Sequence, residues 1–145
     1  METYISNSTK ETEKIAEDFA KKLNCGDVIA YEGPMGMGKT AFTRGLCRGL
    51  GIDDSDVSSP TFALVHEYKG DGKTLYHFDM YRIDTMDDLY STGFFDYLDT
   101  DGILAIEWSE NINSALPKGT IYVTIESVND DENKRKITIK GDDRF

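Results

Sequence analysis

Cysteine is scarce in this chain of 145 residues, which contains only Cys25 and Cys47. Two thiols do not make the disulfide framework of a small secreted domain, and their separation matches no common zinc-ligand spacing. Cys25 falls near an expected helix end, and Cys47 falls on an expected helix face. We therefore expect a pair of buried, reduced thiols and a cytoplasmic protein.

Long apolar runs are also missing. The first twenty residues contain no apolar segment of the signal-peptide type, and no stretch approaches the ~18 apolar residues of a membrane span. The sequence shows no linker, repeat or low-complexity segment. It therefore predicts one domain over residues 1–145, without a membrane partner, that buries about two-thirds of its unfolded surface.

Basic residues are outnumbered in this sequence. Lys and Arg total 16 against 27 Asp and Glu, which gives a formal net charge of −11 and a pI near 4.5. A protein that binds a nucleic-acid backbone by itself needs clustered cations. The composition argues against autonomous nucleic-acid binding, although a role in a nucleic-acid pathway through a basic partner stays open.

The most informative stretch that is present is GPMGMGKT, at residues 33–40. A glycine followed, after four residues, by Gly-Lys-Thr has the spacing of a P-loop, in which backbone N–H groups form a cradle for phosphate oxygens. Lys39 would place its ammonium on the β- and γ-phosphates, and the Thr40 hydroxyl would be a ligand of Mg²⁺. The residues expected to bind nucleotide here are Met35, Gly36, Met37, Gly38, Lys39, Thr40 and Ala41.

The flanks of this stretch agree with a P-loop. Residues 28–31 form a short apolar run of the kind that makes a buried strand. After the loop, Phe42, Leu46 and Leu50 recur every four residues, as one face of a helix should, and we expect Gly49 and Gly51 to end that helix. Strand, loop and helix therefore occur in the order that a nucleotide site requires.

Periodicity and turn residues predict the remaining elements. These are an N-terminal strand or arm at 1–7, a helix from Ser8 to about 24–26 that opens on a Ser8/Glu11 capping box, an antiparallel pair of strands at 62–68 and 74–81, a short helix starting near 84–85, a buried strand at 103–106, and a hairpin at 121–128 and 134–140.

A P-loop also needs a partner carboxylate, usually at the end of a neighbouring buried strand. Glu107 closes the apolar run 103–106, whereas Asp79 lies inside an alternating strand, near His77 and Arg82. The spacing favours Glu107 as the acid on the metal side. A turn or cap role stays open, because the chain contains 27 acids.

Four other residues near these acids have two interpretations each. Trp108 is either a core residue or an aromatic face beside the nucleotide. His66 and His77 are interpreted as strand residues with satisfied hydrogen bonds rather than as catalysts. Arg82 either supplies transition-state charge, as an arginine finger does, or forms an ordinary ion pair.

Four motifs in a fixed order resemble one family. They are GPMGMGKT at 33–40, SPTF at 59–62, YHFDMYR at 76–82, and the Glu107–Trp108 pair. Together they are similar to the bacterial TsaE (YjeE) ATPases, which take part in the threonylcarbamoyladenosine modification of tRNA. The resemblance covers roughly residues 8–110 and says little of the last thirty. The P-loop alone is shared by many NTPases, whereas the combination is specific.

The resemblance implies an α/β fold, a single P-loop NTPase domain with a mixed parallel and antiparallel sheet flanked by helices. It implies ATP and Mg²⁺ as cofactors, with Thr40 and Glu107 as metal ligands. Asp79, Lys39 and Glu107 are then the catalytic residues, Asp79 lying near the γ-phosphate. Thr61 is implied to lie in a switch-like loop beside the phosphates.

Other implications concern partners and Trp108, which becomes a residue of the nucleotide site. Members of the family hydrolyse ATP weakly alone and act with TsaB and TsaD, the latter transferring the threonylcarbamoyl group to adenosine of tRNA. The resemblance therefore implies a partner-dependent ATPase that meets tRNA only through that complex. Pro34, Met35, Met37 and Ser109 depart from the residues that are common in the family, but none of these departures removes a proposed ligand.

Three alternatives remain. A non-catalytic module that binds nucleotide only to assemble a complex has the same motifs. A small-molecule kinase should carry an arginine-rich lid, yet residues 85–101 contain no Lys or Arg. A GTPase should carry Asn-Lys-x-Asp, yet Asn133-Lys134 continues as Arg135-Lys136.

Overall fold

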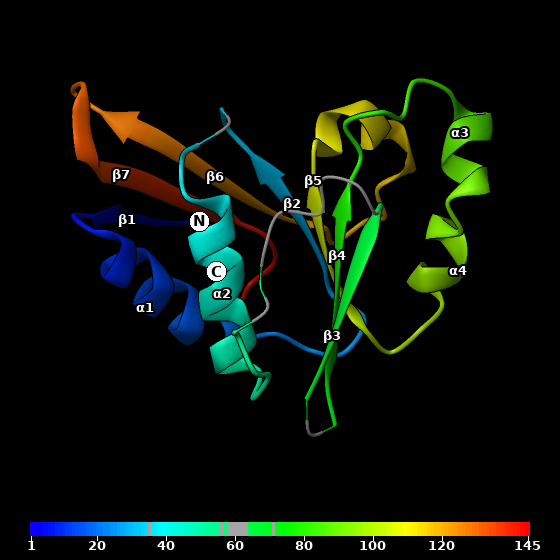
Figure 1. Ribbon diagram of the computed structural model, residues 1–145, viewed down its shortest axis with the longest axis horizontal. Coiled ribbons are helices and arrows are strands. Elements are labelled where there is room, and N and C mark those ends of the chain that lie inside the picture. Colours follow the sequence, from blue (N-terminus) through cyan, green and yellow to red (C-terminus); the bar gives the residue numbers. More distant parts are fainter. Residues whose placement is uncertain (35, 56, 58–63, 71) are drawn as a thin grey trace.

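The computed structural model describes residues 1–34, 36–55, 57, 64–70 and 72–145. The described residues form a seven-stranded sheet of order β1-β7-β6-β2-β5-β4-β3 (Figure 1). Strands β4, β5, β2 and β6 run parallel, whereas β3, β7 and β1 join antiparallel. The predicted mixed α/β fold is confirmed. The strands are β1 (Glu2–Ser6), β2 (Val28–Glu32), β3 (Val65–Lys69), β4 (Thr74–Asp79), β5 (Ile103–Glu107), β6 (Ile121–Val128) and β7 (Asp131–Lys140).

Helices cover the sheet on its two faces (Figure 1). Side chains of a strand alternate between the faces, so Ile29 and Tyr31 pack with the helices α1 and α2, while Val28 packs with the opposite set. Each face therefore has its own apolar core. The helices are α1 (Thr9–Ala20), α2 (Lys39–Gly49), α3 (Met86–Ser91), α4 (Phe94–Leu98) and the 3₁₀ segment η1 (Ser109–Ala115).

Helix α1 begins where the sequence predicts and ends earlier. The Ser8 hydroxyl accepts a hydrogen bond from the Glu11 N–H, while the Glu11 carboxylate accepts from the N–H of Asn7, one residue before the expected capping-box partner. Lys22 N–H and Leu23 N–H donate to carbonyls three residues back, which tightens the last turn and stops the helix at Ala20. The predicted extension to 24–26 is wrong for that reason.

Two glycines bring α1 and α2 into close contact. A Cβ atom on Gly45 would lie 2.2 Å from the Glu13 carbonyl oxygen, and one on Gly49 would lie 2.4 Å from that of Glu17. Gly49 is the last residue of α2, where the sequence predicts the helix to end, and it also allows close packing against α1. Gly51, at φ +74°, is the glycine beyond the helix end that the sequence predicts.

The strand pair next to the site also has different limits from those predicted. Strand β4 ends at Asp79 rather than at 81, because the Asp79 carboxylate accepts a hydrogen bond from the Tyr81 N–H and turns the backbone out of the ladder. Strand β3 begins at Val65, and the predicted start at Phe62 lies outside the described residues.

Three further findings differ from the sequence predictions. Residues 94–98 form helix α4, which the apolar pattern did not predict. The terminal hairpin turns on Asn129 and Asp130 alone, both at positive φ, so β7 starts three residues earlier than predicted. Cys47 is buried, which raises the pKa of its thiol to about 12, but Cys25 lies exposed in a loop, so the expectation of two buried thiols is wrong for Cys25.

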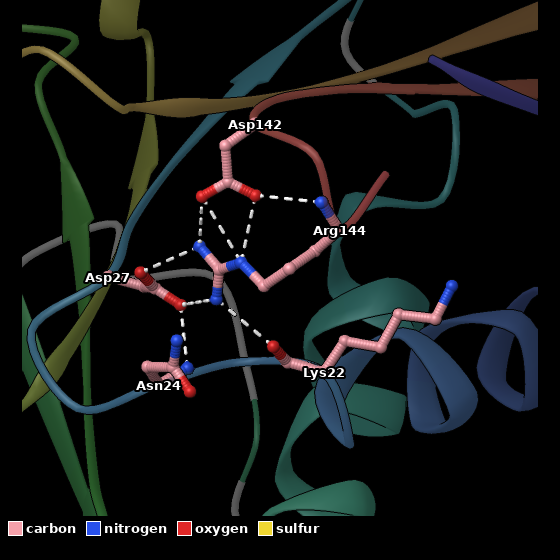
Figure 2. Close-up of polar contacts among 5 residues, drawn as sticks. All are labelled: Lys22, Asn24, Asp27, Asp142 and Arg144. Carbon is pink, nitrogen blue, oxygen red and sulfur yellow. Dashed lines mark hydrogen bonds and ion pairs between the residues drawn. The ribbon is translucent and has the colours of Figure 1, made fainter.

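Residues 141–145, about which the sequence said little, are fixed to the start of β2 by Arg144 (Figure 2). Its two terminal nitrogens donate to the two oxygens of Asp27 at 2.7 and 3.1 Å, and its guanidinium also bonds to Asp142. The pKa of Asp142 falls to about 2, chiefly through this hydrogen bond. The bidentate contact holds the end of the chain against the edge of the sheet opposite the P-loop.

No helix in the described part of the chain is long and apolar enough to cross a membrane.

Candidate functional site

The glycine-rich loop leaves the carboxyl end of β2 and opens into α2. Gly33 has φ +112°, and a Cβ atom there would lie 2.3 Å from the Ile125 carbonyl oxygen of β6. Only glycine allows the loop to pass β6 this closely. Gly38, also at φ +112°, is the N-cap of α2, so the loop ends in a left-handed turn that feeds directly into the helix.

The loop residues that the sequence singled out lie at the start of α2. Lys39 and Thr40 are its first two residues and Ala41 follows in the same turn, while Gly36, Met37 and Gly38 precede them. The Lys39 ammonium donates to the Gly33 carbonyl oxygen at 2.7 Å, which folds the side chain back over the loop. Met35 lies outside the described residues.

A buried pair of hydroxyls fixes the first turn of α2 from behind. Thr43 donates from Oγ1 to the Lys39 carbonyl oxygen at 2.9 Å, so the Tyr31 hydroxyl, 2.7 Å from Thr43 Oγ1, is the donor to it. Burial raises the pKa of Tyr31 well above its ordinary range, which keeps the phenol protonated. The contact ties α2 to β2. The apolar run 28–31 predicted Tyr31 only as a buried strand residue, so this hydroxyl contact was not predicted.

Asp79 and Glu107 close the adjacent strands β4 and β5, and they are register partners. Strand alternation places them on the face that carries α2, because Leu75 and Ile103 of the same alternating sets pack into the α1–α2 core. Two acids that the sequence treated as competitors therefore lie side by side at the edge of the sheet where the P-loop begins.

Glu107 is held by a histidine. The His77 ring nitrogen Nε2 lies 2.6 Å from Glu107 Oε2, His77 is fully buried, and Glu107 is 9% exposed. Its other oxygen, Oε1, has no hydrogen-bond partner among the described residues. His77 Nδ1 has none there either, so the interpretation of His77 as a fully satisfied strand residue is half right.

Asp79 lies where its charge is poorly solvated. Burial raises its pKa, the neighbouring Glu107 charge adds to the increase, and the hydrogen bond from the Tyr81 N–H partly offsets it. An acid whose proton affinity is raised beside a second acid is a common feature of functional sites. The structure thus gives Asp79 and Glu107 different environments.

Trp108 begins the turn after Glu107 at φ +59° and is half-buried. Its ring packs against the core under α3 and α4 and lies 5.0 Å, centre to centre, from that of Tyr81, which is 59% exposed. The side-chain amide of Asn111 donates to the carbonyls of Met80 and Tyr81 and fixes this turn. Trp108 is therefore neither wholly core nor wholly exposed.

The donor set at this edge suits a hard cation. Thr40 offers a hydroxyl and Glu107 a carboxylate oxygen that His77 does not occupy, and oxygen atoms are the ligands that Mg²⁺ prefers. The residues present therefore fit Mg²⁺. Thr61, which was expected beside the phosphates, lies outside the described residues.

Comparison with known proteins identifies the chain's relatives. The sequence profile described as "Threonylcarbamoyl adenosine biosynthesis protein TsaE" matches residues 6–137. The chain is 37% identical over 139 residues to "tRNA threonylcarbamoyladenosine biosynthesis protein TsaE" of Bacillus subtilis, covering 96% of this chain and 84% of that protein. It is 41% identical over 121 residues to the protein of the same name from Haemophilus influenzae, covering 83% and 76%.

A solved structure agrees with the sequence relatives. The crystal structure of YdiB from Bacillus subtilis superposes with a TM-score of 0.76 at 30% sequence identity, covering 97% of this chain and 84% of that one. The profile match spans most of the chain, and the relatives are matched over most of their own length. This chain therefore belongs to the TsaE family.

Proposed function

We propose that this chain is an ATPase that binds Mg-ATP on its P-loop and acts, with TsaB and TsaD, in the threonylcarbamoyladenosine modification of tRNA. The observation that carries the proposal is the register pairing of Asp79 and Glu107 beside the loop that opens α2. Parallel α/β sheets bind ligands at the carboxyl ends of their strands. In phosphoryl transfer to water, one acid can help to hold the metal ion while a second polar group orients the attacking water.

The loop and helix α2 bind the phosphates in this account. Backbone N–H groups and the N-terminus of α2 favour the negative charge, and the Lys39 ammonium exchanges the Gly33 carbonyl for phosphate oxygens. Thr40 and Glu107 hold Mg²⁺, Glu107 through the oxygen that His77 leaves free. When bound, Mg²⁺ neutralises charge on the phosphates. His77 keeps the Glu107 carboxylate in one orientation.

Asp79 orients the attacking water and accepts its proton. Its raised pKa makes it a stronger base than an exposed aspartate, and its Oδ1 is already fixed by the Tyr81 N–H. The second oxygen, Oδ2, is then the atom left to contact water. Trp108 and the exposed Tyr81 form an aromatic surface at the rim, which we assign to the nucleotide base or to a partner.

The acidic surface supports dependence on partners. With a net charge of −11 the chain is a poor ligand for the phosphate backbone of tRNA, so TsaB and TsaD make the contact with tRNA. The names of the relatives support the pathway: the Bacillus subtilis and Haemophilus influenzae sequence relatives are both called "tRNA threonylcarbamoyladenosine biosynthesis protein TsaE".

The test is ATP turnover by the purified chain, alone and with its cognate TsaB and TsaD, with Lys39→Ala as the blank. We expect slow turnover alone, a large increase with the partners, and none in the blank. Asp79→Asn should still bind Mg-ATP but lose the stimulated turnover. Rapid turnover that ignores the partners would contradict the proposal, and ATP binding without turnover in any mixture would favour the non-catalytic module.

A further inference from the structure

Arg135 of β7 differs in its hydrogen-bond partners from three other arginines of the described part of the chain. Among the described residues, Arg44, Arg48 and Arg144 each lie within ion-pair distance of a carboxylate. No described carboxylate lies that close to Arg135, although the chain has 27 acids and 16 bases. The Arg135 guanidinium therefore bonds to something other than a carboxylate.

Its strand position directs Arg135 toward the P-loop. Ile137 and Ile139 of the same alternating set pack into the core under α1 and α2, so Arg135 lies on the face that carries α2. Its register partners on the neighbouring strands are Ser6 and Ser127, both small, so they leave room for a long side chain. The register shifts just beyond, between Ser127 and Val128, and such irregularities re-aim side chains beside functional sites.

The guanidinium reaches a carbonyl of the loop itself. Arg135 Nε donates to the Met37 carbonyl oxygen at 3.2 Å, across 98 positions of sequence, while Nη1 donates to the Lys134 carbonyl at 2.8 Å. The second contact fixes the guanidinium against its own strand. Arg135 thereby joins β7 to the P-loop.

The geometry of the peptide bond gives this contact a consequence for phosphate binding. The peptide between Met37 and Gly38 is trans, so its C=O and N–H point in opposite directions. A donor that holds the Met37 oxygen on the β7 side of the loop turns the Gly38 N–H away from β7. In a P-loop, N–H groups at these positions form the cradle for the phosphates.

We propose that Arg135 is a positioning residue of the nucleotide site, which fixes the Met37–Gly38 peptide so that the Gly38 N–H is directed at a bound phosphate group. The inference rests on the proposed function, because it assumes that the loop binds phosphate. It assigns a role to the C-terminal hairpin, for which no role was predicted from the sequence. A hydrogen bond from a strand to the loop makes the cradle preorganised, so the loop loses less conformational freedom on binding.

The experiment compares Arg135→Gln and Arg135→Lys with Lys136→Gln, which removes the same charge from the next residue on the opposite face of β7. Calorimetric titrations use Mg-ADP and inorganic pyrophosphate, and ¹⁵N NMR follows the Gly38 amide without ligand. Arg135→Gln should weaken both ligands by the same factor, about tenfold, the size of one charge-assisted hydrogen bond. Arg135→Gln should also shift the NMR resonance of the Gly38 amide. Lys136→Gln should change the affinity for either ligand by no more than about twofold and should leave the Gly38 resonance in place.

Several results would overturn the inference. Binding by Arg135→Gln within about twofold of the wild type would do so, as would an equal loss in Lys136→Gln, which would point to charge alone. A loss confined to Mg-ADP would mean that Arg135 contacts base or ribose instead. If circular dichroism shows that Arg135→Gln does not fold, the Arg135→Lys variant tests the inference instead. Lysine keeps the charge but offers a different donor geometry, so this variant should lose less affinity, again by the same factor for both ligands. The Lys39→Ala variant separates the two proposals. If Lys39→Ala binds the ligands as tightly as the wild type does, the proposed function fails, whatever the Arg135 variants show.

Discussion

Asp79 is held in a position that opposes its own ionisation. Burial and the adjacent Glu107 charge raise its pKa, so the folded protein binds the Asp79 proton more tightly than the unfolded chain does. At a pH well below about 4 the carboxyl is protonated in the folded and unfolded states, and there is no cost. As the pH rises through the folded-state pKa, the native state carries a poorly solvated charge and loses stability relative to the unfolded state.

Asp79→Asn should therefore raise the melting temperature at pH 7 while abolishing partner-stimulated turnover. The increase in melting temperature should shrink as the pH falls and vanish near pH 3, because the wild-type Asp79 side chain is then neutral as well. Scanning calorimetry between pH 3 and 8 measures it, with Asp101→Asn, which removes a charge from an exposed turn, as the control. A wild type more stable than Asp79→Asn at pH 7 would show that the Asp79 charge is stabilised by its surroundings.

Residue types and spacing selected Asp79 and Glu107 as candidate site residues, but did not predict that they lie side by side. Two strand-end acids could be recognised in the sequence, yet their pairing depends on β4 and β5 being neighbours, which spacing alone does not show. The His77–Glu107 contact has the same origin. Arg135 could not have been found at all, because its partner Met37 is 98 positions away and offers only a backbone carbonyl.

At the scale of elements, the P-loop depends on the two helices that pack beside it. Gly45 and Gly49, one turn apart on α2, let its backbone approach that of α1, and α1 in turn places Thr12 against the loop. A Cβ atom on Gly38 would lie 4.0 Å from the Thr12 methyl group. The distance between α1 and α2 therefore determines how closely Thr12 packs against the loop.

Gly45→Ala should destabilise the protein although alanine is the better helix former. The new Cβ atom would meet the Glu13 carbonyl at 2.2 Å, and overpacking of this kind costs about 1–3 kcal/mol, against a propensity gain of about 1 kcal/mol. We expect a net loss of up to about 2 kcal/mol in urea denaturation. Lys10→Ala on the exposed side of α1 should stay within about 0.5 kcal/mol of the wild type. Equal or greater stability of Gly45→Ala would mean that the helices are not in close contact there.

The existence of most elements was predictable, because local patterns determine them: the capping residue Ser8, the helical stripe of α2 and the turn residues of the hairpins. The order of the strands was not. β1 joins β7, and β6 joins β2 in parallel, through contacts between residues more than ninety positions apart. Strand β4 stops at Asp79 because of one side-chain hydrogen bond, which a periodic pattern cannot show.

At the scale of the molecule, the P-loop carries cations although the chain is acidic overall. The net charge is −11, yet Lys39 and Arg135 both donate hydrogen bonds to carbonyls of the loop, at the edge of the sheet that also carries Asp79 and Glu107. Such local cations are what an anionic nucleotide needs on an acidic protein. The same net charge disfavours binding to the phosphate backbone of free tRNA, in line with the proposed action through partners.

The proposed function requires that this edge of the sheet binds the phosphates of a nucleoside triphosphate. The most direct measurement is calorimetric titration of the purified chain with Mg-ATP, beside Lys39→Ala. We predict one molecule bound per chain and an affinity at least about tenfold lower in the variant, because a charge-assisted contact to phosphate is lost. Absence of binding in the wild type, or equal affinity in the variant, would contradict the account.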